Sequence, residues 1–264
     1  MRNGIGRHGY SARFGQVFLR DTGIARREAE FAIGKRVVEL GTGRGILTRE
    51  LAMVAREVVS FEIDKRLFDE ASASMNYENL HLVNMDFFKA NMDDYGRFDI
   101  LVSNAPYYLS SRIIEWVAGN RMESLLCLQR EFVERITAKE GERGYNYIGV
   151  LSSLALIIRK VIDVPRGMFE PVPRVDSVVI SIHPRTAALD SDVLRIISLL
   201  MEHRRKSARN ALIDSSKSLN IGREAAREIS ESIPYSREKV FRIPPAGLYD
   251  LSTLIAGACT GIRR

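Results

Sequence analysis

The chain has 264 residues, enough to bury a substantial core as one large domain or as one domain with a smaller partner. Its hydrophobic fraction of 45% and charged fraction of 27% are ordinary for a globular protein. The chain has only two cysteines, Cys127 and Cys259, which is too few for a disulfide framework. No apolar run reaches the length of a membrane span. We expect a cytoplasmic monomer with no membrane partner.

The formal net charge is +6, and its position along the chain is more informative than its size. Six arginines and one acid lie within residues 1–27, and 13 basic and 9 acidic side chains lie within residues 186–264. Basic segments at both ends fit a surface that meets a phosphate backbone, and a solvated basic surface without a partner fits equally well. An arginine-rich start is also typical of a mitochondrial transit peptide. A sequence motif begins by Gly15, however, so only a few residues before it could form a cleavable transit peptide.

Strands and helices are predicted to alternate over the first half of the chain. Short apolar runs predict strands over 36–40, 58–62, 80–83, 98–103 and 125–128, and amphipathic segments predict helices over 45–55, 64–74 and 109–119. This alternation indicates βαβ units and a largely parallel sheet. Two further strands, 155–164 and 177–183, flank a proline-rich loop and predict an antiparallel pair added to that sheet.

The pattern after residue 184 is helical only, with helices predicted over 191–213, 222–231 and 246–256. We therefore predict an α/β domain over residues 1–187, built on a seven-stranded, mostly parallel sheet. A small all-α domain is predicted over residues 188–264.

A glycine-rich turn joins the first predicted strand to the first helix within residues 37–48. Glu39 precedes a G-x-G-x-G pattern that ends at Gly45, and glycines let the backbone turn tightly and approach a ligand closely. A nicotinamide-binding fold would have a glycine three residues after Gly43, where Ile46 stands. The spacing favours a nucleoside methyl donor, and the alternative is a purely structural turn.

Acidic residues follow the next two predicted strands. Glu62 lies at a strand's carboxyl end, where a carboxylate can accept hydrogen bonds from both ribose hydroxyls. Asp64 fits an N-cap of the following helix instead. Asp86 can accept from the exocyclic amine of an adenine while Phe87 lies against the ring, and a turn-forming aspartate is the alternative.

The fourth predicted strand ends in Asn104-Ala105-Pro106-Tyr107. An amide oxygen and a backbone carbonyl held by proline can both accept hydrogen bonds from an exocyclic NH₂ group. Those two bonds draw the amine out of conjugation with its ring and aim its lone pair, and the aromatic residue can stack on the base. A turn that caps a helix is the alternative.

Together these motifs resemble the KsgA-type ribosomal RNA adenine dimethyltransferases, over nearly the whole chain from Phe14. Residues 13–19 are similar to the family's R-F-G-Q-N-F-L segment, with Val17 in place of the asparagine. Residues 128–135, 169–177 and 203–212 are similar to its Q-K-E-x-x-x-R helix, its F-x-P-x-P-x-V-D-S stretch and its C-terminal basic helix. The resemblance implies a Rossmann-like class I methyltransferase domain.

The resemblance also implies a reaction: dimethylation of the exocyclic amino nitrogen of two adjacent adenines near the 3′ end of small-subunit ribosomal RNA. The donor would be S-adenosylmethionine, without a metal, and the partner would be that RNA or a pre-assembled small subunit during its biogenesis. One alternative is the drug-resistance branch that methylates large-subunit RNA. Another is a methyltransferase-like assembly or transcription factor that has lost catalysis.

Three groups of site residues follow from the motifs and the resemblance. The predicted cofactor group is Val17, Leu19, Glu39, Gly41, Gly43, Glu62, Asp86, Phe87 and Asn104. The predicted target-base group is Asn104, Ala105, Pro106, Tyr107 and Phe169, in which Tyr107 and Phe169 sandwich the base unless they are core residues. The predicted RNA-binding group is Arg205, Lys206 and Arg209 on one face of the 191–213 helix, with Arg7 and Arg13, which a flexible solvated tail would explain equally well.

Overall fold

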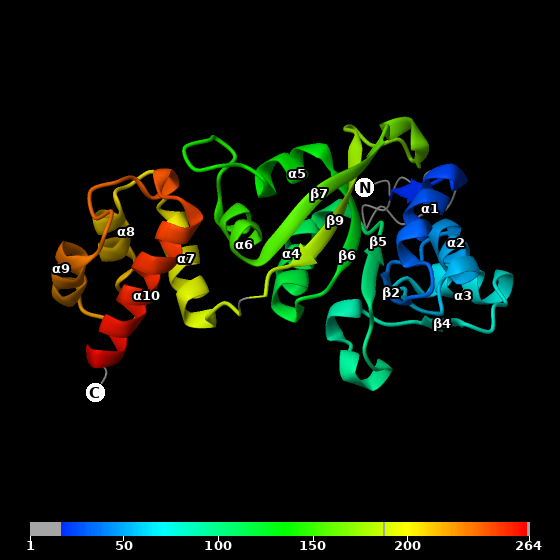
Figure 1. Cartoon of the computed structure of the whole chain (residues 1–264), viewed down its shortest axis with the longest axis horizontal. Helices are drawn as coiled ribbons and strands as arrows, with labels where there is room; N and C mark the ends of the chain where they lie inside the picture. The colour runs from blue at the N-terminus through cyan, green and yellow to red at the C-terminus, as the bar shows by residue number, and fades with distance from the viewer. Residues whose placement is uncertain (1–16, 187, 263–264) are drawn as a thin grey trace, which may run out of the picture. The chain divides into compact units, whose positions relative to one another are not determined.

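The computed structural model describes residues 17–186 and 188–262 (Figure 1). Contacts divide the chain into two compact units. The sheet unit runs to Phe132 and includes Ile158–His183, and the helical unit comprises Val133–Ile157 and the chain from Pro184 onward. The segment Val133–Ile157 therefore groups with the C-terminal helices, and a boundary of independent domains at residue 187 stays a prediction.

The sheet unit is built on seven strands in the order β4-β3-β2-β5-β6-β9-β7. The strands are β2 (Arg36–Leu40), β3 (Glu57–Phe61), β4 (Leu80–Val83), β5 (Ile100–Ser103), β6 (Ser124–Gln129), β7 (Leu156–Val164) and β9 (Ser177–Pro184). The first five strands in this order are parallel to their neighbours, and β9 is antiparallel to β6. The predicted fold class, a mostly parallel seven-stranded sheet, is confirmed.

Helices cover the sheet because strands buried on both faces need an apolar layer on each. These helices are α1 (Thr22–Ala29), α2 (Ile46–Val54), α3 (Lys65–Ser74) and α4 (Ser110–Asn120). Helix α5 (Arg130–Ile136) begins in the sheet unit and continues into the helical unit. Ala25 of α1 and Leu51 of α2 pack with Val37 and Ile100 in one core. On the other side of the sheet, α4 buries Ile113 and Ile114 (Figure 1).

A second, two-stranded sheet joins distant parts of the chain. Strand β1 (Phe18–Leu19) pairs antiparallel with β8 (Phe169–Glu170). The Arg44 guanidinium reinforces the pair with an ion pair to the Glu170 carboxylate, 2.9 Å from Nη1 to Oε2. This small sheet was not predicted, because strands of two residues carry no periodicity.

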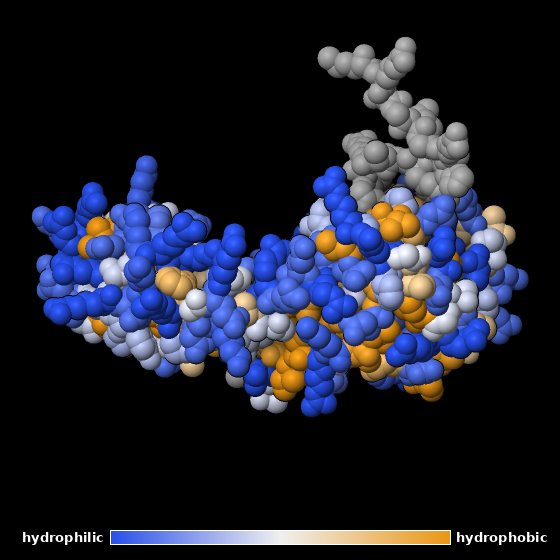
Figure 2. Space-filling view, turned by 90° about the horizontal axis from the view of Figure 1, so that it is seen from above, coloured by the Kyte–Doolittle hydropathy of each residue, from blue (hydrophilic) through white to orange (hydrophobic). Residues whose placement is uncertain are grey.

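The helical unit packs helices from two stretches of the chain around its own core. Its helices are α6 (Tyr147–Ala155), α7 (Ser191–Glu202), α8 (Ala208–Ser215), α9 (Arg223–Ser232) and α10 (Pro245–Ile262). The side chains of Ile197, Leu200, Leu212 and Leu251 are fully buried in it. The face of the helical unit that Figure 2 shows is mostly hydrophilic. Within the described ranges, no helix combines the length and hydrophobicity of a membrane span.

The predicted single helix over 191–213 is wrong. Helix α7 ends at Glu202, a turn follows, and α8 begins after Ser207, whose hydroxyl accepts from the Asn210 amide. The carbonyls of Arg204 and Lys206 accept from the amides of residues 241 and 240, so this turn is bonded to another segment and cannot continue the helix. Arg205 therefore lies in the turn and not on one helical face with Arg209.

Candidate functional site

The glycine turn between β2 and α2 has the backbone that its sequence predicts. Gly41, Gly43 and Gly45 have φ angles of 90°, 54° and 75°, in the left-handed region that favours glycine. The turn is anchored to β3 because the Gly41 amide donates to the Phe61 carbonyl at 2.9 Å. A Cβ atom added at Gly43 would lie 3.2 Å from the Phe18 ring. The turn therefore lies close to β1.

Glu62 connects the end of β3 to the glycine turn. Its Oε2 accepts from the Gly43 amide at 2.9 Å and its Oε1 accepts from the Asp64 amide at 2.8 Å. The side chain is buried, and this burial raises the pKa of Glu62, although the two backbone bonds act against that shift. Asp64 caps α3 by accepting from the Arg66 amide, as predicted.

Asp86 and Phe87 follow β4 and begin the short helix η3 (Phe87–Lys89). The Asp86 carboxylate accepts from the Phe88 amide at 3.0 Å. Phe87 is buried edge-on between Phe61 and Trp116, with ring centroids 5.6 Å and 4.8 Å away. A carboxylate beside aromatic rings is an arrangement suited to an amino-substituted heterocycle.

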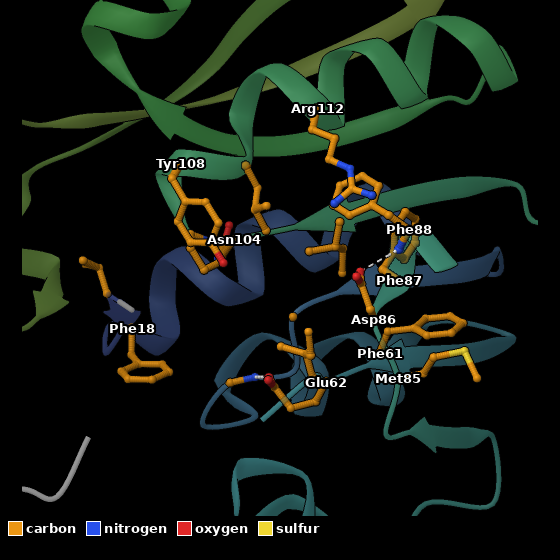
Figure 3. Close-up of a pocket in the computed structure, with 17 residues that line it drawn as sticks. Phe18, Phe61, Glu62, Met85, Asp86, Phe87, Phe88, Asn104, Tyr108 and Arg112 are labelled. Atoms are coloured by element: carbon orange, nitrogen blue, oxygen red, sulfur yellow. Dashed lines mark hydrogen bonds between the residues drawn. The ribbon is translucent and has the colours of Figure 1, made fainter. Parts of the chain in front are cut away.

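These residues surround a pocket of about 210 Å³ (Figure 3). Of the predicted cofactor group, the residues that line it are Val17, Gly41, Gly43, Glu62, Asp86, Phe87 and Asn104. Lining residues that the sequence analysis missed include Phe18, Ile63, Met85, Phe88, Tyr108 and Arg112. Several of these directly adjoin predicted residues along the chain, and that adjacency is the signal that could have identified them.

Leu19 and Glu39 of the predicted cofactor group do not line this pocket. Leu19 packs in the core beneath α1. The Glu39 carboxylate lies behind the glycine turn, where Oε2 accepts from the hydroxyls of Thr48 at 2.8 Å and Ser60 at 2.6 Å. Burial raises the pKa of Glu39 to about 7. Glu39 therefore braces β2 against β3 and α2, and its contact with a cofactor stays a prediction.

Asn104 follows β5 and is one of the residues that line the pocket (Figure 3). Its Nδ2 donates to the Glu28 carboxylate at 3.0 Å from Nδ2 to Oε2. Its Oδ1 is buried and accepts no hydrogen bond from the described residues. Glu28 was missed by the sequence analysis, although a glutamate in the apolar stripe of Ala25 and Ala29 was a signal for it.

The target-base group lies around a second, smaller hollow. Its lining residues are Val17, Asn104, Ala105, Pro106, Tyr107, Cys127 and Phe169. The Tyr107 hydroxyl is 2.8 Å from the Ser177 hydroxyl, and burial raises the pKa of Tyr107 to about 12. Phe169 is 2% exposed and packs in the core, whereas Tyr108 is 64% exposed. Stacking of a base by Tyr107 and Phe169 stays a prediction.

The helical unit carries an open basic groove of about 810 Å³. Its lining residues are Lys206, Ser207, Arg209, Asn210, Ile213, Asp214, Arg223, Arg227, Ser236 and Arg237. Lys206 pairs with Asp214 at 2.7 Å and Arg209 approaches Glu231 at 3.7 Å. Arg205 does not line the groove, and Arg7 and Arg13 fall outside the described residues.

Three arginines of this basic groove were not predicted from the sequence. Arg223 and Arg227 are four residues apart on α9, the spacing that places two side chains on one helical face. That spacing was the available signal. Arg237 lies in a turn and carried none.

Comparison with known proteins gives a family for this chain. A family model described as ribosomal RNA adenine dimethylase matches residues 7–229. A relative from Methanococcus maripaludis, named as a probable ribosomal RNA small subunit methyltransferase A, is 31% identical and aligns over 93% of this chain and 97% of its own. A ribosomal RNA small subunit methyltransferase A from Thermotoga neapolitana is 36% identical, over 75% of this chain and 78% of its own.

Solved structures share the fold. A dimethyladenosine transferase from Plasmodium falciparum superposes with a TM-score of 0.74 at 22% identity, over 91% of this chain and 98% of its own. The 23S rRNA methyltransferase ErmE superposes with a TM-score of 0.59 at 25% identity, over 90% of this chain and 99% of its own. With the family model matched over most of its length, the chain belongs to the ribosomal RNA adenine dimethylase family, as its motifs predict.

Proposed function

We propose that this protein transfers methyl groups from S-adenosylmethionine to the exocyclic amino nitrogens of two adjacent adenines near the 3′ end of small-subunit ribosomal RNA. The observation that carries the proposal concerns Asn104, which lines the pocket together with Gly41 and Glu62 and whose buried Oδ1 has no hydrogen-bond partner among the described residues. The protein would act as a cytoplasmic monomer during small-subunit biogenesis, on the RNA or on a pre-assembled subunit.

The pocket fits a nucleoside methyl donor. The glycine turn exposes backbone without side chains, the Glu62 carboxylate suits ribose hydroxyls, and Asp86 beside Phe87 suits an adenine ring and its amine. S-adenosylmethionine supplies an already activated methyl group on a sulfonium ion. The protein's contribution is therefore to position two reactants and to exclude water.

The Asn104 motif fits the other reactant, an adenine amine. Asn104 Oδ1 and the backbone carbonyl before Pro106 each accept one amine hydrogen, which aims the nitrogen lone pair at the donor. After transfer the nitrogen is more acidic and loses its proton to water or to Asn104. An adenine must leave its helical stack to reach this position, and Tyr107 and Phe169 are the proposed stacking partners.

The names of the relatives support small-subunit RNA as the substrate, because those that align over most of this chain are named small-subunit methyltransferases. The similarity to the 23S rRNA methyltransferase ErmE supports a second candidate, an adenine of large-subunit RNA. The two candidates share the chemistry and differ in the RNA alone.

Mass spectrometry separates the two candidates. Purified protein is incubated with labelled S-adenosylmethionine and with unmethylated small or large subunits, and RNase fragments are then analysed. We expect dimethyladenosine at two adjacent positions near the 3′ end of small-subunit RNA. The Asn104→Ala variant should bind the donor and lose at least tenfold in transfer rate, because the lost bonds strengthen in the transition state. Label only in large-subunit RNA, or near-native transfer by the variant, would contradict the proposal.

A further inference from the structure

Asn104 is held by a buried carboxylate that does not line the pocket. Glu28 lies in the last turn of α1 and is 1% exposed. Its Oε2 accepts from Asn104 Nδ2 at 3.0 Å, the one hydrogen bond of the Asn104 side chain within the described residues. Glu28 Oε1 and Asn104 Oδ1 are both buried without a partner among those residues. Burying a carboxylate that uses only one of its two oxygens in hydrogen bonds costs free energy, so the buried position of Glu28 requires an explanation.

The two ends of a carboxamide have opposite hydrogen-bonding character. The amide NH₂ only donates and the amide oxygen only accepts, whereas an ionised carboxylate only accepts. A Glu28 carboxylate can therefore face only Nδ2 of Asn104, and this orientation directs Oδ1 away from Glu28. A protonated Glu28 also donates, so it tolerates the flipped amide. In the flipped orientation, the NH₂ group of Asn104 would meet the NH₂ group of an adenine, donor against donor.

We infer that Glu28 is a positioning residue for methyl transfer, which in its carboxylate form holds the Asn104 amide with Oδ1 available to the target amine. This inference rests on the proposed function of Asn104 and adds a residue from a separate element, α1, to that function. None of the family motifs that this chain resembles includes position 28. Because Glu28 bonds to Asn104 and does not line the pocket, it acts through Asn104 and does not itself touch the substrate.

The environment of Glu28 makes this orientation sensitive to pH. Burial raises the pKa of Glu28 to about 8, the Asn104 bond lowers it, and the nearby Glu39 carboxylate on β2 raises it further. Cys127 on β6 also faces Glu28, and burial and Glu28 keep the pKa of its thiol well above the usual value. Rising pH ionises Glu28 and fixes the productive amide orientation, and falling pH protonates Glu28 and releases it.

The first experiment replaces Glu28 by glutamine, which keeps the shape but can face Asn104 with either its oxygen or its NH₂ group. We expect Glu28→Gln to lower kcat about tenfold or more, the effect of losing one charge-assisted hydrogen bond. The affinity for S-adenosylmethionine and the KM for RNA should stay unchanged. The parent kcat should rise with pH to a plateau, and the variant should remain at the low-pH level throughout.

Glu50→Gln is the matched control. Glu50 is a buried glutamate on the adjacent helix α2, 8% exposed and paired with Arg26 at 3.3 Å. It neither lines the pocket nor bonds to Asn104. We expect this variant to keep the parent kcat and pH profile, because the substitution removes a buried charge without changing the orientation of the Asn104 amide.

The two hypotheses fail in different ways. If Asn104→Ala retains full activity, the proposed function fails. If Asn104→Ala is inactive but Glu28→Gln keeps the parent kcat and pH profile, Glu28 has no positioning role. Should Glu28→Gln not fold, the parent protein labelled with ¹⁵N-asparagine provides the test. The Asn104 side-chain NH signal, assigned by its loss in Asn104→Ala, should move downfield as Glu28 ionises, and a signal that is constant from pH 6 to pH 9 overturns the inference.

Discussion

Glu28, Glu39 and Glu62 are buried carboxyl groups around one site, and burial raises the pKa of each above its usual value. A carboxyl group with a raised pKa binds its proton more tightly in the folded chain than in the unfolded chain. Its contribution to stability is complete below the unfolded pKa and is lost as pH rises through the folded pKa. These three carboxyl groups therefore make the fold less stable as the pH rises.

Glu28→Gln should consequently gain thermal stability relative to the parent as pH rises. The pKa of Glu28 moves from 4.5 to about 8 on folding, so the melting temperatures should be closest at pH 5 and diverge towards pH 9 in favour of the variant. Calorimetry across this range measures the difference.

Glu57→Gln is the contrasting control for this measurement. Hydrogen bonding to Arg36 lowers the pKa of Glu57, so its contribution to stability is already complete at pH 5. From pH 7 to pH 9, the melting temperature of this variant should differ from the parent by nearly the same amount. A difference for Glu28→Gln that is equally constant would show that Glu28 does not ionise over this interval.

Glu62 accepts hydrogen bonds from the Gly43 and Asp64 amides, and its proposed role adds ribose hydroxyls. We expect Glu62→Ala to weaken S-adenosylmethionine binding by about 10- to 100-fold, the loss of roughly 1.5–3 kcal/mol for a charge-assisted bond. Titration calorimetry measures this affinity. Asp64→Ala is the control, because Asp64 caps α3 with its side chain and should cost stability but not affinity. Equal affinities of parent and Glu62→Ala would exclude Glu62 from the site.

At the scale of an element, the strand–turn–helix of β2 and α2 needs both a left-handed backbone and empty space. Gly43 has a φ of +54°, and a Cβ there would crowd the Phe18 ring at 3.2 Å. Gly34 has a φ of +69° with nothing within 4 Å of an added Cβ. These two glycines therefore separate the backbone requirement from the requirement for space.

Alanine at either glycine should cost about 1–2 kcal/mol of unfolding free energy, the strain of a left-handed residue, as measured by urea denaturation. Only Gly43→Ala should also weaken S-adenosylmethionine binding, because it displaces Phe18 at the pocket wall. Comparable affinity losses for both variants would mean that global destabilisation, and not the turn itself, controls binding.

Elements with strong periodicity were predictable from the sequence, and those defined by distant contacts were not. The runs at 36–40 and 80–83 became β2 and β4 without change of bounds, because alternation and apolar content are local properties. Leu199 and Ile213 keep helical spacing across residues 203–207, so the sequence looks continuous there. The interruption depends on hydrogen bonds to residues 240 and 241, which local sequence does not encode.

The same limit applies to the site. Gly41, Glu62, Asp86 and Asn104 were predictable because parallel strands bring their carboxyl ends to one edge of the sheet, and all four line the pocket. The partnership of Glu28 with Asn104 was not predictable, since it joins α1 to the end of β5. A charged residue in an apolar stripe indicates only that some partner exists.

At the scale of the whole molecule, the excess of positive charge gathers in specific places. The lining of the basic groove in the helical unit includes Lys206, Arg209, Arg223, Arg227 and Arg237. Arg205 lies in a turn and does not line the groove. Basic side chains in the groove can bind phosphates and orient an RNA stem without recognising its base sequence. The position of an arginine should therefore affect RNA binding more than its charge alone does.

Filter binding across a salt series tests this distinction. Arg209→Ala combined with Arg227→Ala should weaken RNA binding and reduce the slope of log K against log salt by about one to two units, since each phosphate contact releases counterions. Arg205→Ala, which removes one equal charge outside the groove, should leave the slope nearly unchanged. An equal slope change per arginine at all three positions would mean that net charge alone drives binding.

The pairing of β1 with β8 has a consequence for how the protein matures on the ribosome. Phe18 at the pocket wall is held by a strand that includes Glu170, and Arg44 bonds to the same residue. A nascent chain ending near residue 165 already carries the glycine turn, Glu62, Asp86 and Asn104. It still lacks the partner that fixes β1, and non-local pairings of this kind form late. The wall of the pocket at Phe18 is therefore completed only after Glu170 has been synthesised, when most strands of the sheet are already present.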